Sequence, residues 1–377
     1  MLTLRTLARP PLKMSARFQI TAATRSDDYP LRALLRENPM GQRFRVAFER
    51  EPDFFAASRV QGEFYQVGVA RDTTTNTIVG LGTRAVSTAF LNGQPAPVGY
   101  LGDLRVSSAR RGGTLLARGY RLLREWHADG RTPLYTTVIF GDNTTALTTI
   151  AASRADLPRY HDCGAVHCPG VLLRRRKPAI DAGCEILRAD DALLPEILAC
   201  LNRNNARRQF APRHRAEFFA PGGRWRDFRV SDFHVARRDG RVIGVVGKWD
   251  QRAFKQTRIV GYGGALRWLA ATPLRRAFGL PRAGEYLPFF HACFIAIDDD
   301  DLPVFRALLR RLYNDDVGSG CTYFIIGLHE RDPLRAALDD YALMPFHARL
   351  FAVTFADGEP LLHTLDARVP HIEPALL

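Results

Sequence analysis

The chain repeats one order of secondary structure, and this internal repeat narrows the folds open to it. In each half, an apolar strand leads into an amphipathic helix and then into a second apolar strand. The segments are 100–106, 113–128 and 134–140 in the first half, and 289–297, 302–315 and 322–328 in the second. Tyr135 and Tyr323 mark one register, which places Asp103 opposite His291. The pattern predicts two copies of one unit.

The flanking segments correspond as well. Each half opens with a short strand and a helix, continues with two antiparallel strands, and closes with a short helix and an apolar strand. The opening segments are 17–38 and 184–205, the strand pairs 63–87 and 233–251, and the closing segments 143–173 and 332–355. Ser26 is a candidate cap of the first helix, and Asp239-Gly240 predicts a hairpin turn.

These elements predict an α+β chain with mixed, α/β-type sheets in two tandem units. A length of 377 residues fits two domains better than one. We place the units at residues 16–176 and 182–357, joined by a linker that includes the basic run Arg174–Lys177. The prediction leaves an N-terminal extension at 1–15 and a C-terminal tail at 358–377.

The charge pattern favours small anionic partners over nucleic acid or membranes. The formal net charge is +14, but the basic residues are spread along the whole chain and often stand beside acids, as in Arg226-Asp227. No apolar run reaches the length of a membrane span. Six cysteines at irregular spacing do not form a disulfide framework, which indicates a reducing compartment and predicts a cytoplasmic protein.

The stretch ARRGGTLLARG, residues 109–119, joins a predicted strand to a predicted helix. A helix N-terminus offers unpaired N–H groups and a partial positive charge, so it attracts anions. Gly112 and Gly113 permit close approach of the backbone, and Arg110 and Arg111 can add charge-assisted hydrogen bonds. The stretch is a candidate phosphate site, although a glycine turn with exposed arginines would have the same sequence.

The order of elements resembles the GNAT family of N-acetyltransferases. The resemblance rests on GDLRVSSARRGGTLLARGYRLL at 102–123 and on GDNTTALTTI at 141–150. The family turn has the pattern Arg/Gln-x-x-Gly-x-Gly/Ala. Arg110 and Gly113 match its first two positions, whereas Leu115 stands where the pattern has a small residue.

The resemblance implies acetyl-CoA as a co-substrate, with no metal. The pyrophosphate would bind at the turn and the pantetheine arm along the preceding strand, where main-chain N–H groups polarise the thioester carbonyl. The residues implied at the turn are Arg110, Arg111, Gly112, Gly113, Thr114 and Leu115, and those implied along the arm are Leu104, Arg105, Val106 and Asn143.

Direct attack of an amine on the thioester needs a base and an acid. For the base we favour Asp103, because the corresponding family strand often supplies an acidic residue; its structural alternative is a hydrogen bond to a neighbouring strand or loop. Glu63 is the second candidate. The family often supplies the acid from a tyrosine after the helix that begins at the asparagine. That position is Ile150 here, so Tyr160 is the nearest candidate, with a packed aromatic as its alternative role.

The second half departs from the family at the same turn. It has no glycine there and carries four aspartates at 298–301, which suit helix capping and would repel a pyrophosphate. We therefore predict a degenerate second unit without acyl-CoA. A calcium site at these aspartates and a zinc site at 161–168 both lack the usual ligand spacing. Aromatic residues among arginines at 218–233 indicate core packing, or lining of the acceptor pocket, rather than nucleic-acid binding.

The sequence thus predicts an acyl-CoA-dependent N-acyltransferase, specifically an N-acetyltransferase, that is active in its first half. The acceptor is an unidentified amine. A non-catalytic CoA- or metabolite-binding protein on the same fold is the alternative, because Leu115 and Ile150 depart from the family pattern.

Overall fold

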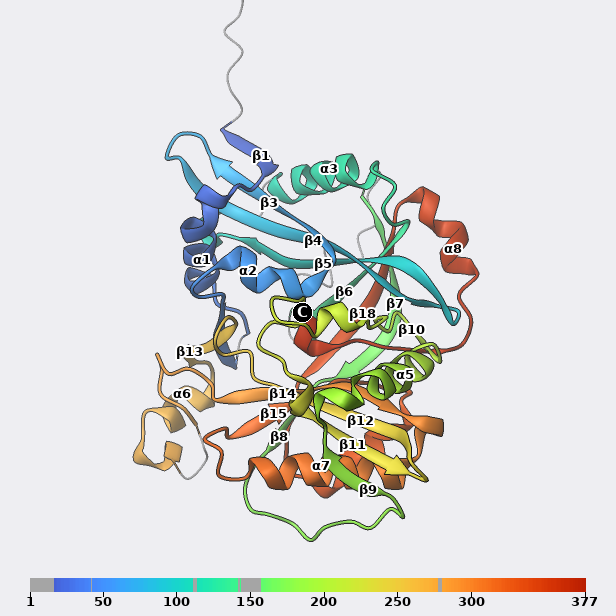
Figure 1. The fold of residues 1–377 in the computed structure, drawn as a ribbon. Coiled ribbons are helices and arrows are strands. Elements are labelled where there is room, and N and C mark those ends of the chain that lie inside the picture. Colours follow the sequence, from blue (N-terminus) through green and yellow to red (C-terminus); the bar gives the residue numbers. More distant parts are fainter. Residues whose placement is uncertain (1–16, 42, 111–113, 142, 144–156, 277–279) are drawn as a thin grey trace, which may run out of the picture.

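The computed structural model describes residues 17–41, 43–110, 114–141, 143, 157–276 and 280–377. Two large mixed sheets form the body of the molecule (Figure 1). The first sheet runs β1 (Phe18–Ala22), β3 (Phe64–Asp72), β4 (Thr77–Leu91), β5 (Gln94–Val106), β6 (Leu134–Phe140), β18 (His347–Thr354), β7 (Arg159–His167) and β16 (Leu328–His329). The second runs β17 (Leu343–Met344), β8 (Gly170–Leu172), β15 (Tyr323–Ile325), β14 (Phe289–Ile297), β12 (Arg241–Trp249), β11 (Phe233–Arg238) and β9 (Glu185–Arg188). The α+β class with mixed sheets is confirmed.

The two halves of the chain exchange their closing strands. β18, from the second half, lies between β6 and β7 of the first sheet and pairs antiparallel with both. β8, from the first half, lies between β15 and β17 of the second sheet. The sequence could not predict this exchange, because two similar units offer equivalent gaps to either closing strand. The unit boundaries within the chain stay a prediction, but in space each sheet contains strands from both halves.

Helices cover the sheets. They are α1 (Asp28–Glu37), α2 (Phe54–Ser58), α3 (Leu115–His127), α5 (Leu194–Asn205), α6 (Ala265–Ala270), α7 (Leu302–Asp316) and α8 (Glu359–His363). Four of them, α1, α3, α5 and α7, follow predicted segments, three were not predicted, and the helix predicted at 332–341 is a 3₁₀ helix at Pro333–Asp340. Leu31, Leu34 and Leu35 form the buried face of α1. Ser26 does not cap this helix, because the N-cap position is Asp27. The Asp27 carboxylate accepts from the Thr24 amide at 2.8 Å, in the 3₁₀ turn that precedes the helix. The predicted extension at 1–15 lies outside the described residues, and so does the helix predicted at 143–152 apart from Asn143.

One small sheet connects the two halves, and a second connects the second half to the tail. β2 (Phe44–Glu49) pairs antiparallel with β13 (Gln256–Tyr262), and β10 (Arg208–Gln209) pairs parallel with β19 (Val369–Pro370). β19 belongs to the predicted tail, which therefore packs into the molecule. Ala375, near its end, is fully buried. In Figure 1 the C-terminus lies at the centre of the molecule, between the two large sheets.

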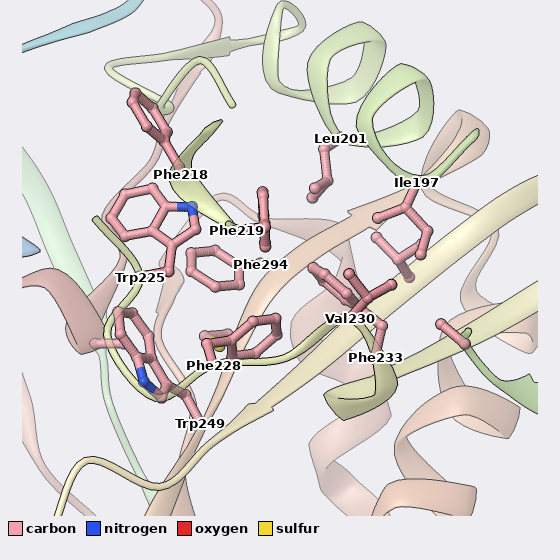
Figure 2. Close-up of a cluster of buried hydrophobic side chains, with 14 of the residues drawn as sticks. Ile197, Leu201, Phe218, Phe219, Trp225, Phe228, Val230, Phe233, Trp249 and Phe294 are labelled. Carbon is pink, nitrogen blue, oxygen red and sulfur yellow. The ribbon is translucent and has the colours of Figure 1, made fainter. Parts of the chain in front are cut away.

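The aromatic residues that stand among arginines in the second half form a core. Figure 2 shows their side chains packed against one another between α5 and the second sheet. The buried aromatic members are Phe218, Phe219, Trp225, Phe228, Phe233, Trp249, Phe254 and Phe294. Core packing is confirmed for the predicted aromatic residues, and lining of an open acceptor pocket is wrong for them, because burial removes these rings from solvent.

Two further features concern the described residues as a whole. All six cysteines are free thiols. No helix in the described ranges is long and apolar enough to cross a membrane.

Candidate active site

A bulge in β5 shapes the candidate site. Thr83 of β4 pairs with Gly102, but Leu81 pairs with Arg105, so two residues of β5 stand opposite one residue of β4. The first of these two residues is Asp103, whose φ of 52° lies in the left-handed region. The parallel backbone pairing of β5 with β6 is confined to Gly99 and Tyr100, before the bulge. Bulges of this kind redirect a side chain and end strand pairing.

The redirected carboxylate of Asp103 forms a buried ion pair with Arg50. An Nη2–Oδ2 distance of 2.6 Å joins them, and both side chains are largely buried. Gln61 Nε2 donates to the same carboxylate at 3.2 Å. Burial acts to raise the pKa of Asp103, but Arg50, Arg105 and Lys255 outweigh it and hold the pKa below its ordinary value. Asp103 is therefore ionised at neutral pH.

Residues from the second half complete this site. Lys255 Nζ donates to the backbone oxygen of Leu377 at 2.6 Å, in the buried tail. Burial and the charge of Arg50 lower the pKa of Lys255 well below its ordinary value, while Asp103 acts in the opposite direction. Burial and the charge of Lys255 also lower the pKa of His291, to about 3. The site thus lies at the seam between the two halves of the chain.

The turn before α3 is partly described. Arg110 Nη2 lies 3.2 Å from the buried carboxylate of Asp72, so its guanidinium is held by the protein itself. Arg111, Gly112 and Gly113 lie outside the described residues. Thr114 is the N-cap of α3, and its side chain is exposed. Leu115 is buried with Ala70 and Val79, so its side chain faces the sheet.

The second sheet has the same bulge, but residues of the C-terminal tail lie against it. Cys293 of β14 pairs with Gly247 and Ala296 with Val245, and Phe294 between them has a φ of 51°. Asp103 therefore corresponds to Phe294. The predicted correspondence of Asp103 with His291 is wrong, because the spacing of the two tyrosines does not hold for the neighbouring strands: Gly99 lies beside Tyr135, but Phe289 lies beside Tyr323.

The tail supplies a carboxylate to this second bulge. The backbone N–H of Phe294 donates to Glu373 Oε2 at 2.7 Å. Burial raises the pKa of Glu373 to about 7. The remaining cavity, lined in part by His371 and Glu373, has a volume of about 20 Å³, roughly the space of one water molecule.

The turn before α7 is also occupied by carboxylates of the chain itself. Asp301 caps α7 by accepting from the Val304 amide at 3.1 Å. Asp298 accepts from Arg203 Nε at 2.7 Å. The predicted helix capping is confirmed. The N-cap of α7 is thus the aspartate Asp301, preceded by three more aspartates, whereas the N-cap of α3 is Thr114.

Comparison with solved structures identifies this arrangement. A GCN5-related glucosamine N-acetyltransferase region of a fungal multi-domain GH3 β-N-acetylglucosaminidase matches with a TM-score of 0.63 and 14% identity, over 90% of this chain and 38% of that chain. Saccharomyces cerevisiae N-myristoyltransferase with bound myristoyl-CoA matches with a TM-score of 0.59 and 12% identity, over 92% of this chain and 81% of that chain. The chain has the GNAT fold.

A third match is a probable N-acyltransferase from Enterococcus faecalis, with a TM-score of 0.50 and 10% identity over 89% of this chain and 72% of that chain. No protein-family model matches the chain. No curated protein matches it in sequence. At these identities the similarity establishes the GNAT fold alone.

The second candidate base, Glu63, and the candidate acid, Tyr160, lie in different surroundings. Glu63 is exposed and accepts from Arg215 Nη2 at 2.6 Å and from the Thr88 amide at 2.9 Å. The Tyr160 hydroxyl lies 2.5 Å from that of Tyr120 on α3. Burial and this neighbour raise the pKa of Tyr160 well above its ordinary value. In the described part of the chain, the Asp103 carboxylate accepts from the side chains of Arg50, Gln61 and Thr83, and neither Glu63 nor Tyr160 is among these partners.

The predicted pantetheine-binding residues lie around the bulge and at the end of β6. Leu104 is the second bulge residue and is half exposed. Arg105 and Val106 rejoin the pairing with β4. Asn143 follows β6, and its backbone N–H donates to Phe140 O at 2.9 Å. Their roles in binding CoA stay predictions.

The sequence alone did not point to Arg50, Lys255 or the tail. Arg50 is one of many arginines, and it approaches Asp103 only because β2 crosses to pair with β13. The only indication for Lys255 in the sequence was that it is one of few lysines in an arginine-rich chain. At 161–168, where the ligand spacing argued against zinc, His161 Nε2 contacts Thr354 and Glu359. The described residues hold no group of three or more side chains that could bind a metal ion.

Proposed function

We propose that this chain is an acyl-CoA-dependent N-acyltransferase that binds its co-substrate at the first sheet alone. The observation that carries the proposal is the difference between two equivalent bulges. In the second sheet, Glu373 accepts from the bulge amide and Asp301 caps α7. In the first sheet, the bulge directs Asp103 toward Arg50, and α3 begins without an acidic residue. A helix start free of acids favours phosphate binding.

The proposed reaction is direct transfer of an acyl group from the thioester to an amine. The amine nitrogen forms a bond to the acyl carbon, the carbon–sulfur bond breaks, and CoA leaves as the thiolate. Asp103, ionised at neutral pH, accepts the proton that the amine loses. Tyr160, protonated because of its raised pKa, is the candidate donor of a proton to the thiolate. The acetyl group is the proposed acyl group, on the basis of the resemblance in the turn before α3.

A specific observation favours a second candidate, a non-catalytic CoA-binding protein on the same fold. Asp103 is held in an ion pair, and a carboxylate with a lowered pKa is a weak base. Such a protein would bind CoA and would release no thiol in the presence of any amine.

Thiol release from acyl-CoA, measured across a panel of amines, tests the proposal. We expect turnover with at least one amine, and a loss of about 10²- to 10⁴-fold in kcat for Asp103→Asn, with CoA binding retained. Asp298→Asn is the matched control, because it also removes an aspartate paired with arginine, at the second sheet. CoA binding without turnover would support the second candidate, and absence of CoA binding would overturn both.

A further inference from the structure

An insertion distinguishes the second half from the first. In the first sheet, β4 joins β5 through Asn92 and Gly93 alone. In the second, the corresponding strands β12 and β14 are separated by β13, by α6 and by a 3₁₀ turn at Pro273–Arg276. Figure 1 shows α6 and this turn at the edge of the molecule, beside β13 and away from the two large sheets. The insertion is therefore a surface feature that the repeat itself does not require.

The insertion combines exposed apolar side chains with basic ones. Trp268 is 70% exposed and Leu274 60%, which places both among the most exposed large hydrophobic side chains of the described residues. The Arg267 guanidinium lies 5.0 Å from the Trp268 ring centroid. Arg282 is exposed as well. The sequence from 263 to 284 contains no aspartate or glutamate. The next residue, Glu285, accepts from the backbone amide of Arg282 at 2.7 Å, so the basic surface is bounded by one exposed acid.

A neighbouring strand extends the basic surface. The Gly263 amide donates to the backbone oxygen of Arg43 at 3.0 Å, which fixes the start of the insertion beside the start of β2. Arg43 is exposed. An exposed arginine from a separate segment thus lies beside the start of the insertion that carries these apolar side chains.

We propose that α6 and the turn at Pro273–Arg276 dock on a membrane surface that contains anionic lipids. Tryptophan and leucine gain free energy when they enter the boundary between headgroups and acyl chains, and arginine gains when it lies near anionic headgroups. Trp268 and Arg267 are adjacent and provide one apolar anchor and one basic group for such a surface. Helix α6 has six residues and lies on such a surface rather than crossing it. The basic residues are spread along the whole chain, so the sequence did not predict this local combination of exposed apolar and basic side chains.

Sedimentation of the full-length protein with lipid vesicles tests the proposal. We expect binding to phosphatidylcholine vesicles that contain phosphatidylglycerol, weaker binding to pure phosphatidylcholine, and a decrease with added salt. Removal of two arginines in Arg267→Gln/Arg282→Gln lowers the partition coefficient about 30-fold, because each basic residue near the surface contributes about fivefold. Trp268→Ala lowers it as well, by removing the apolar anchor.

Matched variants separate this surface from general positive charge. Arg175→Gln/Arg176→Gln removes the same charge from the exposed linker, and Tyr29→Ala removes another exposed aromatic ring; both retain binding. Vesicles with brominated lipids quench the fluorescence of the wild type but not that of Trp268→Ala. The proposal is overturned if wild-type binding does not depend on phosphatidylglycerol, or if the linker variant weakens it as much as Arg267→Gln/Arg282→Gln. Salt-sensitive binding of an oligonucleotide without vesicle binding would assign the surface to nucleic acid instead.

Discussion

The backbone amide of Phe294 donates to the carboxylate of Glu373 at 2.7 Å, at the bulge that corresponds to Asp103 in the first sheet. The chain thus fills one of its two GNAT bulges with its own tail. The same tail continues to Leu377, whose backbone oxygen accepts from Lys255 beside the Asp103 site. Closure of the second bulge and completion of the first site are consequently coupled through a few residues of the tail.

The buried Glu373 gives the stability a specific pH dependence. Its pKa in the folded protein is about 7, against an ordinary value of 4.5, because burial disfavours the charged form. The folded state therefore holds this proton more tightly than the unfolded state. The stabilisation is fully present below about pH 4.5 and is lost as the pH rises toward 7, by about 3 kcal/mol in total.

Chemical denaturation of the wild type and Glu373→Gln across this range measures the effect. We expect the free energy of unfolding of the wild type to decrease relative to that of Glu373→Gln as the pH rises from 4.5 to 7. An identical pH dependence in the two proteins would contradict this account of Glu373.

The ion pair between Arg50 and Asp103 sets the pH dependence of the proposed reaction. Removal of the Arg50 charge in Arg50→Met raises the pKa of Asp103, since burial then acts against fewer cations. We expect the acidic limb of the kcat profile to move to higher pH. Loss of one partner of a buried pair also costs stability, about 3–5 kcal/mol.

Arg50→Lys is the control for that experiment, because it keeps the charge and should keep the position of the acidic limb near that of the wild type. If Arg50→Met is active with an unshifted limb, Asp103 is not the group that titrates in the reaction.

The exchange of closing strands makes the halves of the chain interdependent. β18 lies between two strands of the first sheet, so a half that ends at residue 179 lacks a central strand. We expect residues 1–179 and 180–377 to be insoluble when produced separately, and to form a stable complex when produced together. Size-exclusion chromatography of the co-expressed halves measures this. Two soluble, monomeric halves would show that the exchange is not required for folding.

Continuous apolar runs were the most predictable parts of the fold. The predicted strands at 134–140 and 289–297 have the observed bounds of β6 and β14, since both are apolar runs that end at turn residues. The hairpin at Asp239-Gly240 is also confirmed: both residues have positive φ between β11 and β12. The local sequence pattern was sufficient to predict those strands and turns whose conformation is determined by their own residues.

Contacts between distant segments were not predictable in the same way. The tail from residue 358 contains short polar and apolar stretches without periodicity, yet Ala375 and Glu373 are buried in the second half. Asp103 was identified from the sequence, but its partner Arg50 was not, because their approach depends on a strand pair between the halves. Leu115 stands where the family pattern has a small residue, and its side chain packs on the first sheet.

The central claim, one CoA site at the first sheet, is tested most directly by isothermal titration calorimetry with CoA. The account predicts one CoA bound per chain. Thr114→Glu, which places a carboxylate at the start of α3, should weaken binding about 100-fold, since like charges in contact cost several kcal/mol. Asp301→Ser, the matched change at the start of α7, should leave the affinity unchanged. Two sites per chain, or binding that withstands Thr114→Glu, would contradict the account.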